Sequence, residues 1–299
     1  MPAFKISEDH MIPVESGQAV SVGWTSYGDR KPWGVTWHWT ATWDLAMCSK
    51  ILGGANATRK GEASAHYGIG LSFEEGVDRY VSLENRSWHA GAGQEMRWDG
   101  KSVRHDGQWW SGARTTVGVE TVNIGYARKG VTAQPDWKFC VHPNGKQEMF
   151  VPPWPEEQIA MMIAIGKEIV ERWPHIKVRD HHGHHDICPG HKSDVCGFPF
   201  ARVLRGIYDD PTIPDVWEPL WTNEQRQRAL VALGYDLGSF GPNGDGVDGD
   251  WGRKSDAVLR DFQRSRGMVE NGQWTTFVNW EVYDVLKERG IDLAEATKG

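Results

Sequence analysis

The clearest hydrophobic pattern in the chain lies between residues 155 and 173, where apolar side chains recur at spacings of three, four and about seven residues. This period places them on one face of an α-helix. Pro155 suits the start of such a helix, because the first backbone N–H groups have no partner within it. The apolar positions are Ile159, Met162, Ile163, Ile169, Val170 and Trp173.

Runs of β-branched and aromatic residues predict strands on both sides of this helix. Residues 34–40 and 117–122 form two such runs, and residues 176–178 form a short third one after the helix. Strands that alternate with a helix indicate an α/β fold with a mixed central β-sheet flanked by helices. In the second run, strand alternation places Glu120 opposite Val117 and Val119, on a partly apolar face where a carboxylate usually has a purpose.

A second, smaller unit follows a segment rich in proline and acidic residues. Residues 209–219 contain three prolines and four acids, which is typical of an extended linker. Beyond it, three helical patterns surround a long glycine-rich turn, and these predict a small all-α three-helix domain. The predicted helices are 224–234, 255–266 and 278–289, the turn is 241–252, and the divisions of the chain are 1–208, 209–222, 223–290 and a tail at 291–299.

The composition is that of an ordinary globular chain, 39% hydrophobic and 24% charged, and 299 residues favour two domains. The net charge of -7 provides no general attraction to nucleic acid. No apolar run reaches transmembrane length and residues 1–10 lack the apolar core of a signal peptide, so we expect cytoplasmic synthesis without export and no membrane insertion. The four cysteines predict no disulfide framework, and only a pair between Cys188 and Cys196 stays open.

The densest group of chemically active side chains lies in residues 183–194, Gly-His-His-Asp-Ile-Cys-Pro-Gly-His-Lys-Ser-Asp. A hydrolytic zinc site takes three ligands from the protein and leaves a fourth position for water. This segment could supply two of them, and His38, in the predicted strand 34–40, is the best candidate for the third. A single histidine is more often structural than a ligand. Five histidines between residues 181 and 191 weaken that alternative but leave the assignment within the cluster open.

These segments together resemble the zinc-dependent N-acetylmuramoyl-L-alanine amidases of the type-2 group, which also contains the peptidoglycan recognition proteins and amidase-type phage lysozymes. The resemblance extends over roughly residues 30–200, in the family's order. It is carried by His38, Ala-His-Tyr-Gly-Ile-Gly at 65–70, Ser-Trp-His-Ala-Gly at 87–91, Val-Gly-Val-Glu at 117–120 and the segment 183–194.

The resemblance implies a zinc cofactor and a role for five residues. Some family members take the third ligand from a cysteine eight residues after the second histidine, and others from an aspartate ten residues after it. The lysine at 192 and the aspartate at 194 fit the aspartate branch, and Cys196 is a reserve ligand because thiolates bind zinc well. The implied ligands are His38, His184 and Asp194, with Glu120 as the catalytic carboxylate and Lys192 as the stabilising charge.

The remaining histidines and aromatics near these motifs are assigned supporting roles. His184 is favoured as the ligand by its place in Gly-His-x-Asp, so His181, His182 and His185 are expected to orient neighbours or face solvent. A second expectation is that the substrate groove is lined by His66, Trp88 and His89. The alternative for an aromatic residue is core packing, which we favour for most of the 17 tryptophans.

The second unit resembles the three-helix peptidoglycan-binding domain. Leu-Gly-Tyr at 233–235, Val-Asp-Gly-Asp-Trp-Gly at 247–252 and Ala-Val-Leu-Arg-Asp-Phe-Gln at 257–263 stand in that family's order. The aspartate-rich turn lacks the alternating acids and closing glutamate of a calcium-binding loop. A catalytic and a binding domain on one chain predict an enzyme held on peptidoglycan, where its local substrate concentration is high.

We therefore expect a monomeric, zinc-dependent peptidoglycan hydrolase that cleaves the amide bond between N-acetylmuramic acid and L-alanine. A wall-binding domain without an export signal resembles a phage endolysin, made in the host bacterial cytoplasm and acting on the cell wall after release. Three alternatives stay open: a non-catalytic peptidoglycan recognition protein, a cytoplasmic muropeptide-recycling amidase, and an unrelated hydrolase whose zinc is structural, closed by a fourth ligand such as Cys196.

Overall fold

The computed structural model describes residues 4–12, 31–53, 63–90, 115–188 and 192–299. It also gives the backbone of five short strands, β2 (Trp24–Thr25), β7 (Arg97–Trp98), β8 (Lys101–Ser102), β9 (Arg104–His105) and β10 (Gln108–Trp109). The first three residues of the expected leaderless N-terminus, Gly91 of the motif at 87–91, and residues 189–191 of the histidine-rich segment lie outside the described residues.

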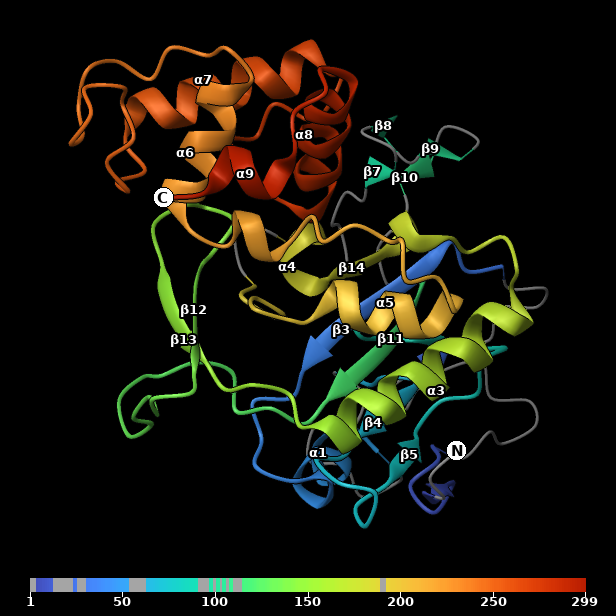
Figure 1. Cartoon of the computed structure of the whole chain (residues 1–299). Helices are drawn as coiled ribbons and strands as arrows, with labels where there is room; N and C mark the ends of the chain where they lie inside the picture. The colour runs from blue at the N-terminus through green and yellow to red at the C-terminus, as the bar shows by residue number, and fades with distance from the viewer. Residues whose placement is uncertain are drawn as a thin grey trace.

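A six-stranded sheet forms the centre of the larger region, in the order β1-β5-β4-β11-β3-β14 (Figure 1). Neighbouring strands are parallel except for the antiparallel pair β4 and β5. The predicted mixed sheet flanked by helices is therefore confirmed. The strands are β1 (Ile6–Ser7), β5 (Val77–Arg79), β4 (Tyr67–Ile69), β11 (Thr116–Thr121), β3 (Gly34–Trp39) and β14 (His181–Gly183), with a short pair between β2 and β6 (Arg86–Ser87) beside them.

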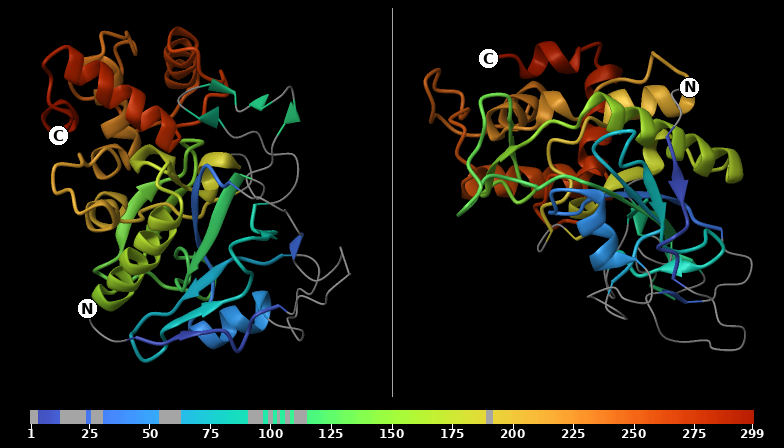
Figure 2. Two further views of the ribbon diagram at one scale, coloured as in Figure 1. Left: turned by 90° about the vertical axis from the view of Figure 1, so that its right-hand side faces the viewer. Right: turned by 90° about the horizontal axis from the view of Figure 1, so that it is seen from below.

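Helices α3 (Glu156–Arg172) and α5 (Phe200–Tyr208) pack side by side against this sheet (Figures 1 and 2). Two glycines allow the close approach: a Cβ on Gly166 would lie 2.2 Å from Ile207 Cδ1, and one on Gly206 would lie 2.4 Å from Ile163 Cδ1. Helix α3 begins and ends one residue inside the predicted limits. A smaller hydrophobic core forms around α1 (Leu45–Leu52).

The strand predicted at residues 176–178 is wrong, because this segment leads into a 3-10 turn, η1 (Val178–Asp180), and the strand starts at His181. The carboxylate of Asp180 accepts the backbone N–H of Lys177 at 2.7 Å. An acidic side chain that bonds to nearby backbone in this way favours a turn over a strand. Ile176 is buried all the same, so its apolar character reflects packing rather than strand pairing.

The C-terminal region is helical and consists of α6 (Asn223–Ala232), α7 (Arg253–Ser265), α8 (Thr276–Glu288) and the short α9 (Leu293–Thr297). Helix α6 begins with a capping box in which Thr222 and Gln225 each accept the other's backbone N–H. The segment 291–299, expected to be a tail, contains α9, which packs on α6 and buries Leu293. None of the described helices has the length and apolar character that a membrane crossing requires.

Residues 209–222 connect the two regions but are packed rather than extended in solvent. Trp217 is 4% exposed and stacks on Phe200 of α5, with 5.0 Å between ring centroids. Its other neighbour is Trp280 of α8, at 5.5 Å. The hydrophobic core is therefore continuous from the sheet into the helical region. Ile213, Val216 and Leu220 are also buried, the last in the turn η2 (Glu218–Leu220).

A hairpin formed by β12 (Lys138–Val141) and β13 (Glu148–Val151) extends from the larger region to the C-terminal helices (Figure 1). The guanidinium of Arg226 on α6 donates to the carbonyl oxygens of Val141 and His142, at 2.6 and 3.0 Å, and to that of Leu220 at 2.9 Å. Arg226 is 4% exposed. The hairpin and the helical region thus form one hydrogen-bonded unit.

Candidate metal centre and active site

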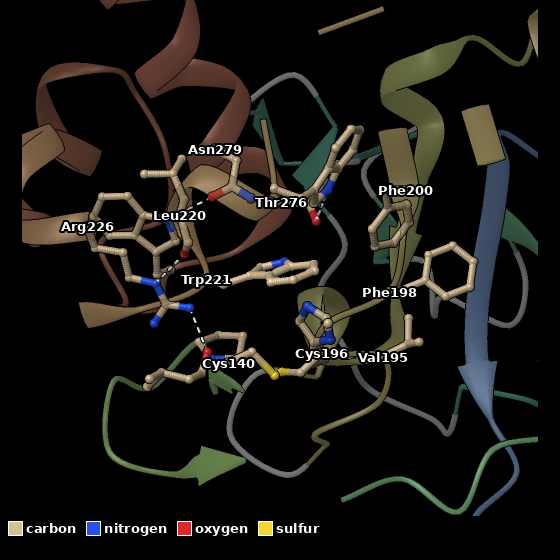
Figure 3. Close-up of a pocket in the computed structure, with 16 residues that line it drawn as sticks. Cys140, Val195, Cys196, Phe198, Phe200, Leu220, Trp221, Arg226, Thr276 and Asn279 are labelled. Atoms are coloured by element: carbon tan, nitrogen blue, oxygen red, sulfur yellow. Dashed lines mark hydrogen bonds between the residues drawn. The ribbon is translucent and has the colours of Figure 1, made fainter. Parts of the chain in front are cut away.

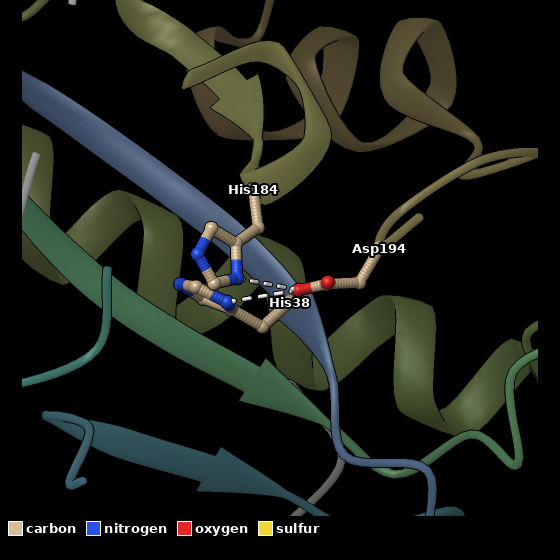
Figure 4. Close-up of side chains that lie close together, drawn as sticks. All are labelled: His38, His184 and Asp194. Atoms are coloured by element: carbon tan, nitrogen blue, oxygen red, sulfur yellow. Dashed lines mark hydrogen bonds and ion pairs between the residues drawn. The ribbon is translucent and has the colours of Figure 1, made fainter. Parts of the chain in front are cut away.

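Three buried side chains from separate segments converge at one edge of the sheet (Figure 4). His38 lies near the end of β3, and His184 follows the parallel neighbour β14 to open the short helix α4 (His184–Ile187), so both leave the sheet at the same edge. Asp194 comes from the loop before α5. Asp194 Oδ2 lies 3.1 Å from His38 Nδ1 and 3.0 Å from His184 Nδ1.

The donor set and spacing of this group fit a zinc ion. Zinc binds histidine nitrogen and carboxylate oxygen at about 2.0–2.2 Å, which in a tetrahedral site puts neighbouring ligand atoms roughly 3.3 Å apart. The three ligand atoms here all lie within 4.8 Å of one another. Two histidines and one carboxylate are also a common ligand set of catalytic zinc sites, which keep the fourth position for water.

The protonation states of His38 and Asp194 suit metal binding. Burial, and then the neighbouring His184, lower the pKa of His38 to about 4, so its imidazole is neutral near pH 7. Burial alone would raise the pKa of Asp194, but His184 and His38 hold it well below its usual value. A metal ligand must present a free lone pair, so a neutral imidazole and an ionised carboxylate are the required forms.

Glu120 lies beside these ligands because β11 pairs with β3 in a register that aligns Glu120 with His38. Its Oε1 is 4.0 Å from His38 Nδ1, and the side chain is 12% exposed. At this separation the carboxylate is not a direct partner of His38, and one water molecule can lie between such groups. Glu120 can therefore exchange a proton with a water at the metal site.

Lys192 is exposed at the rim of the site, two residues before Asp194. Its charge is near enough to contribute, after burial and His184, to the lowered pKa of His38. Two hydrogen bonds hold its backbone: its N–H donates to the Cys188 carbonyl at 3.0 Å, and its carbonyl accepts from His142 Nε2 at 2.8 Å. Lys192 therefore has a fixed backbone position close to the site.

His89 contacts the ring nitrogen of His38 that faces away from Asp194. His38 Nε2 lies 3.0 Å from His89 Nδ1, and His89 Nε2 lies 3.3 Å from the Thr116 carbonyl. Because a carbonyl can only accept, His89 Nε2 carries a proton, and its Nδ1 accepts from His38 Nε2. This assignment leaves the lone pair of His38 on Nδ1, the atom that faces Asp194.

The family model described as N-acetylmuramoyl-L-alanine amidase matches residues 28–195, which is more than half of the chain. The chain belongs to this family. A second model, described as a putative peptidoglycan binding domain, matches residues 224–278. The protein is therefore a peptidoglycan amidase with a peptidoglycan-binding region, as the motifs indicated.

Solved structures similar to the amidase are distant in sequence. The N-acetylmuramyl-L-alanine amidase AmiD from E. coli, in complex with anhydro-N-acetylmuramic acid-L-Ala-D-gamma-Glu-L-Lys, is 19% identical, with 90% of this chain and 93% of that chain covered and a TM-score of 0.49. AmpDH3 from Pseudomonas aeruginosa is 21% identical over 94% and 100%, with a TM-score of 0.46. The PlyG catalytic domain is 14% identical over 71% and 98%, with a TM-score of 0.38. No curated protein sequence matches the amidase significantly.

Replacing His89 with alanine should weaken metal binding by the amidase about 10- to 100-fold, because the hydrogen bond that orients His38 is lost. Equilibrium competition with a chromogenic chelator measures this affinity. A matched control is Trp88→Ala, which changes the neighbouring, partly exposed aromatic side chain and should leave the affinity unchanged. Equal affinities of the His89→Ala variant and the wild type would remove His89 from this role.

The three residues expected to line the substrate groove have different positions. His66 is fully buried: its Nδ1 accepts from the Gly118 N–H at 3.0 Å, and its Nε2 lies 3.1 Å from the Asn85 carbonyl. These contacts join three segments of the chain and leave no exposed face for substrate. His89 is 7% exposed and contacts His38. Trp88 is partly exposed, so its side chain remains available to contact substrate.

The reserve ligand Cys196 does not join the group of His38, His184 and Asp194. Cys196 is 6% exposed, and its thiol contacts the thiol of Cys140 on β12. Burial raises the pKa of Cys196 well above its usual value, so the thiol is protonated. All four cysteines are free, including Cys188, the other half of the pair left open by the sequence.

The neighbouring histidines of the cluster are structural. His181 and His182 are 0% exposed and His185 is 8% exposed, so none faces solvent. The Trp37 indole N–H donates to His181 Nδ1 at 3.3 Å, so His181 Nε2 carries the proton and donates to the Tyr208 hydroxyl at 3.0 Å. These hydrogen bonds connect the sheet to α5.

His181 should make the amidase less stable at mildly acidic pH. Burial, and then the charge of His182, lower the pKa of His181 to about 3, against 6.5 in the unfolded chain. Below pH 6.5 the unfolded chain therefore binds a proton that the folded protein does not, and stability falls as the pH falls towards 3. The expected loss is about 1.4 kcal/mol per pH unit, or roughly 2 kcal/mol between about pH 7 and pH 5.

A His181→Gln variant keeps an acceptor and a donor but does not titrate, so its stability deficit relative to the wild type should shrink by roughly 2 kcal/mol between about pH 7 and pH 5. Urea unfolding of both proteins at the two pH values measures the difference. A deficit that is the same at both values would show that His181 is not responsible.

Proposed function

We propose that the amidase uses zinc to hydrolyse the amide bond between N-acetylmuramic acid and L-alanine, with His38, His184 and Asp194 as the zinc ligands. The observation that carries this proposal is the convergence of three buried ligand atoms within 4.8 Å of one another, at the edge of the sheet where Glu120 also lies. Burial of charged or polar groups costs free energy unless they are paired or coordinate a metal. The peptidoglycan amidase activity of the family supplies the reaction.

In this proposal, the residues around the site have separate roles in amide hydrolysis. When bound, zinc lowers the pKa of a water molecule to near neutrality and polarises the scissile carbonyl. Glu120 accepts the proton of the attacking water and then transfers it to the leaving amine nitrogen, as general base and then general acid. Lys192 stabilises the negative oxygen of the tetrahedral intermediate with its positive charge.

Two of the alternatives are less well supported. A recognition protein without activity typically lacks a zinc ligand, whereas this chain has the three ligands and Glu120 together. A structural zinc site needs a fourth protein ligand. Within the part of the chain that the structure describes, no fourth histidine, cysteine or carboxylate joins the three-ligand group, and Cys196 contacts Cys140 instead.

The substrate of this proposal is polymeric peptidoglycan rather than a soluble muropeptide. The peptidoglycan-binding match supports this, because an enzyme that recycles soluble fragments gains little from attachment to the wall. We propose an endolysin-like role, in which the amidase is made in a bacterial cytoplasm and degrades the cell wall after release.

Removal of the metal tests the proposal. The purified amidase should contain about one zinc per chain, and dialysis against a chelator should abolish its hydrolysis of a soluble N-acetylmuramoyl-L-alanine peptide. Zinc should restore activity, and magnesium should not, because magnesium prefers six oxygen ligands. A chelated protein that is free of metal and fully active would overturn the zinc-dependent mechanism.

A further inference from the structure

The segments that carry His184 and Asp194 contact the C-terminal helices, on the side of β3 away from β11. A small cavity of about 40 Å³ lies between them (Figure 3). Val195 and Cys196, which directly follow Asp194, form part of one wall, and Thr276 and Asn279 of α8 form part of the other. The site and the helical region are therefore in contact rather than joined only by the chain.

Asp186 makes the most direct link between the two regions. Its side chain is 0% exposed and accepts two backbone N–H groups at 2.7 Å, one from Gly183 and one from Thr276. Gly183 immediately precedes the ligand His184, and Thr276 is the first residue of α8. One carboxylate thus holds the start of α4 and the start of α8 together.

Helix α4 needs such an external contact because it has only four residues. A helix this short is not stable on its own and depends on tertiary contacts. It carries His184, and the next N–H, that of His185, donates to the Asp194 carbonyl at 2.5 Å. A movement of α4 would therefore displace two ligands, His184 directly and Asp194 through this hydrogen bond.

A second set of contacts reaches Lys192. Its carbonyl accepts from His142 Nε2, and the carbonyl of His142 accepts from Arg226 of α6. The backbone N–H of Trp274, just before α8, donates to the Pro143 carbonyl at 2.8 Å. The loop that carries Lys192 and Asp194 is thus held through the hairpin by the same helical region.

We propose that the C-terminal helical region completes the metal centre, and that Asp186 is the positioning residue through which α8 holds His184 and Asp194. This inference rests on the proposed zinc site. It assigns the helical region a role in each turnover, in addition to peptidoglycan binding. Loss of the contact should therefore impair hydrolysis even of a soluble substrate that needs no attachment to the wall.

Two substitutions at Thr276 isolate the contact in the full-length amidase. Thr276→Pro removes the N–H that Asp186 accepts, at the first helical position where proline is well tolerated. The preceding residue, Thr275, has φ -92° and ψ 168°, which a following proline permits. Thr276→Ala keeps the N–H and, like the proline variant, loses the hydroxyl that accepts from the Trp217 indole at 3.2 Å. The difference between the two variants therefore reports the Asp186 contact.

The two variants should differ in turnover and in metal binding. On a soluble muramoyl peptide, Thr276→Pro should lower kcat about 10- to 100-fold relative to Thr276→Ala with little change in KM, and should release zinc to a chelator at a correspondingly lower chelator concentration. The cobalt-substituted Thr276→Pro protein should also have an altered visible absorption spectrum, because the ligand geometry changes. Asp284→Asn, which breaks the ion pair with Arg179 between the same two regions, should leave all three readouts at the wild-type level.

The outcomes separate this inference from the proposed function. A wild type that binds no zinc or is inactive would overturn the proposed zinc mechanism. An active, zinc-containing wild type with equal kcat, zinc affinity and cobalt spectrum in Thr276→Pro and Thr276→Ala would overturn the positioning role alone. An Asp284→Asn variant impaired as strongly as Thr276→Pro would show that general loosening of the junction, not Asp186, is responsible.

Discussion

Replacing Glu120 with alanine should lower turnover of the amidase about 10²- to 10⁴-fold, the usual contribution of a positioned acid–base group, while leaving its zinc content unchanged. Glu120 lies 4.0 Å from His38 Nδ1, near the three ligands but outside their group, so its removal takes away the proton acceptor and no ligand. Zinc content by mass spectrometry, measured on the same preparations as kcat, checks both parts of this expectation.

Two further variants serve as comparisons for Glu120→Ala. His38→Ala should lose both zinc and activity, because the histidine is a ligand in the proposed site. Glu120→Gln keeps the size of the side chain but cannot accept a proton, so it should be as inactive as Glu120→Ala. A zinc-loaded Glu120→Ala protein with wild-type turnover would remove this residue from the mechanism.

Replacing Arg226 with alanine should lower the free energy of unfolding by about 3–5 kcal/mol. Arg226 is 4% exposed, and its guanidinium donates to three carbonyl oxygens, in the hairpin and in the segment before α6. Its pKa is lowered by burial to about 10, so the group stays charged at neutral pH. Removal of the side chain takes one donor from each of these carbonyls, although that of His142 still accepts from the Gly145 N–H, and it opens space in the core.

Urea unfolding of the full-length protein measures this loss. The control is Arg264→Ala on α7, where the arginine forms ion pairs with Asp261 and Glu270 at the surface. Exposed ion pairs contribute little, so this variant should unfold close to the wild-type midpoint. If Arg226→Ala were no less stable than the control, the hairpin and the helical region would not be coupled through this residue.

The sequence predicted the elements whose evidence is local. The apolar period between residues 155 and 173 placed α3 to within one residue at each end, because a helix that covers a sheet repeats its buried positions along its own length. The motif order also identified the family, and the segments carrying His38, His184 and Asp194 do converge in the structure.

What the sequence did not indicate depends on contacts between distant segments. Trp217 lies among prolines and acids that suggest a solvated linker, yet it is buried between Phe200 and Trp280. His66 and His89 have similar local surroundings, and only the fold places one against backbone of other segments and the other against His38. The burial of Trp217 and the hydrogen bonds of these two histidines leave no periodic pattern in the chain.

The most direct test of the central claim is digestion of purified peptidoglycan with the zinc-loaded amidase, followed by mass spectrometry of the soluble products. Cleavage between N-acetylmuramic acid and L-alanine predicts free stem peptides that begin with alanine, beside glycan strands without stems. Products with new reducing sugar ends and intact stems, or no soluble products at all, would contradict it.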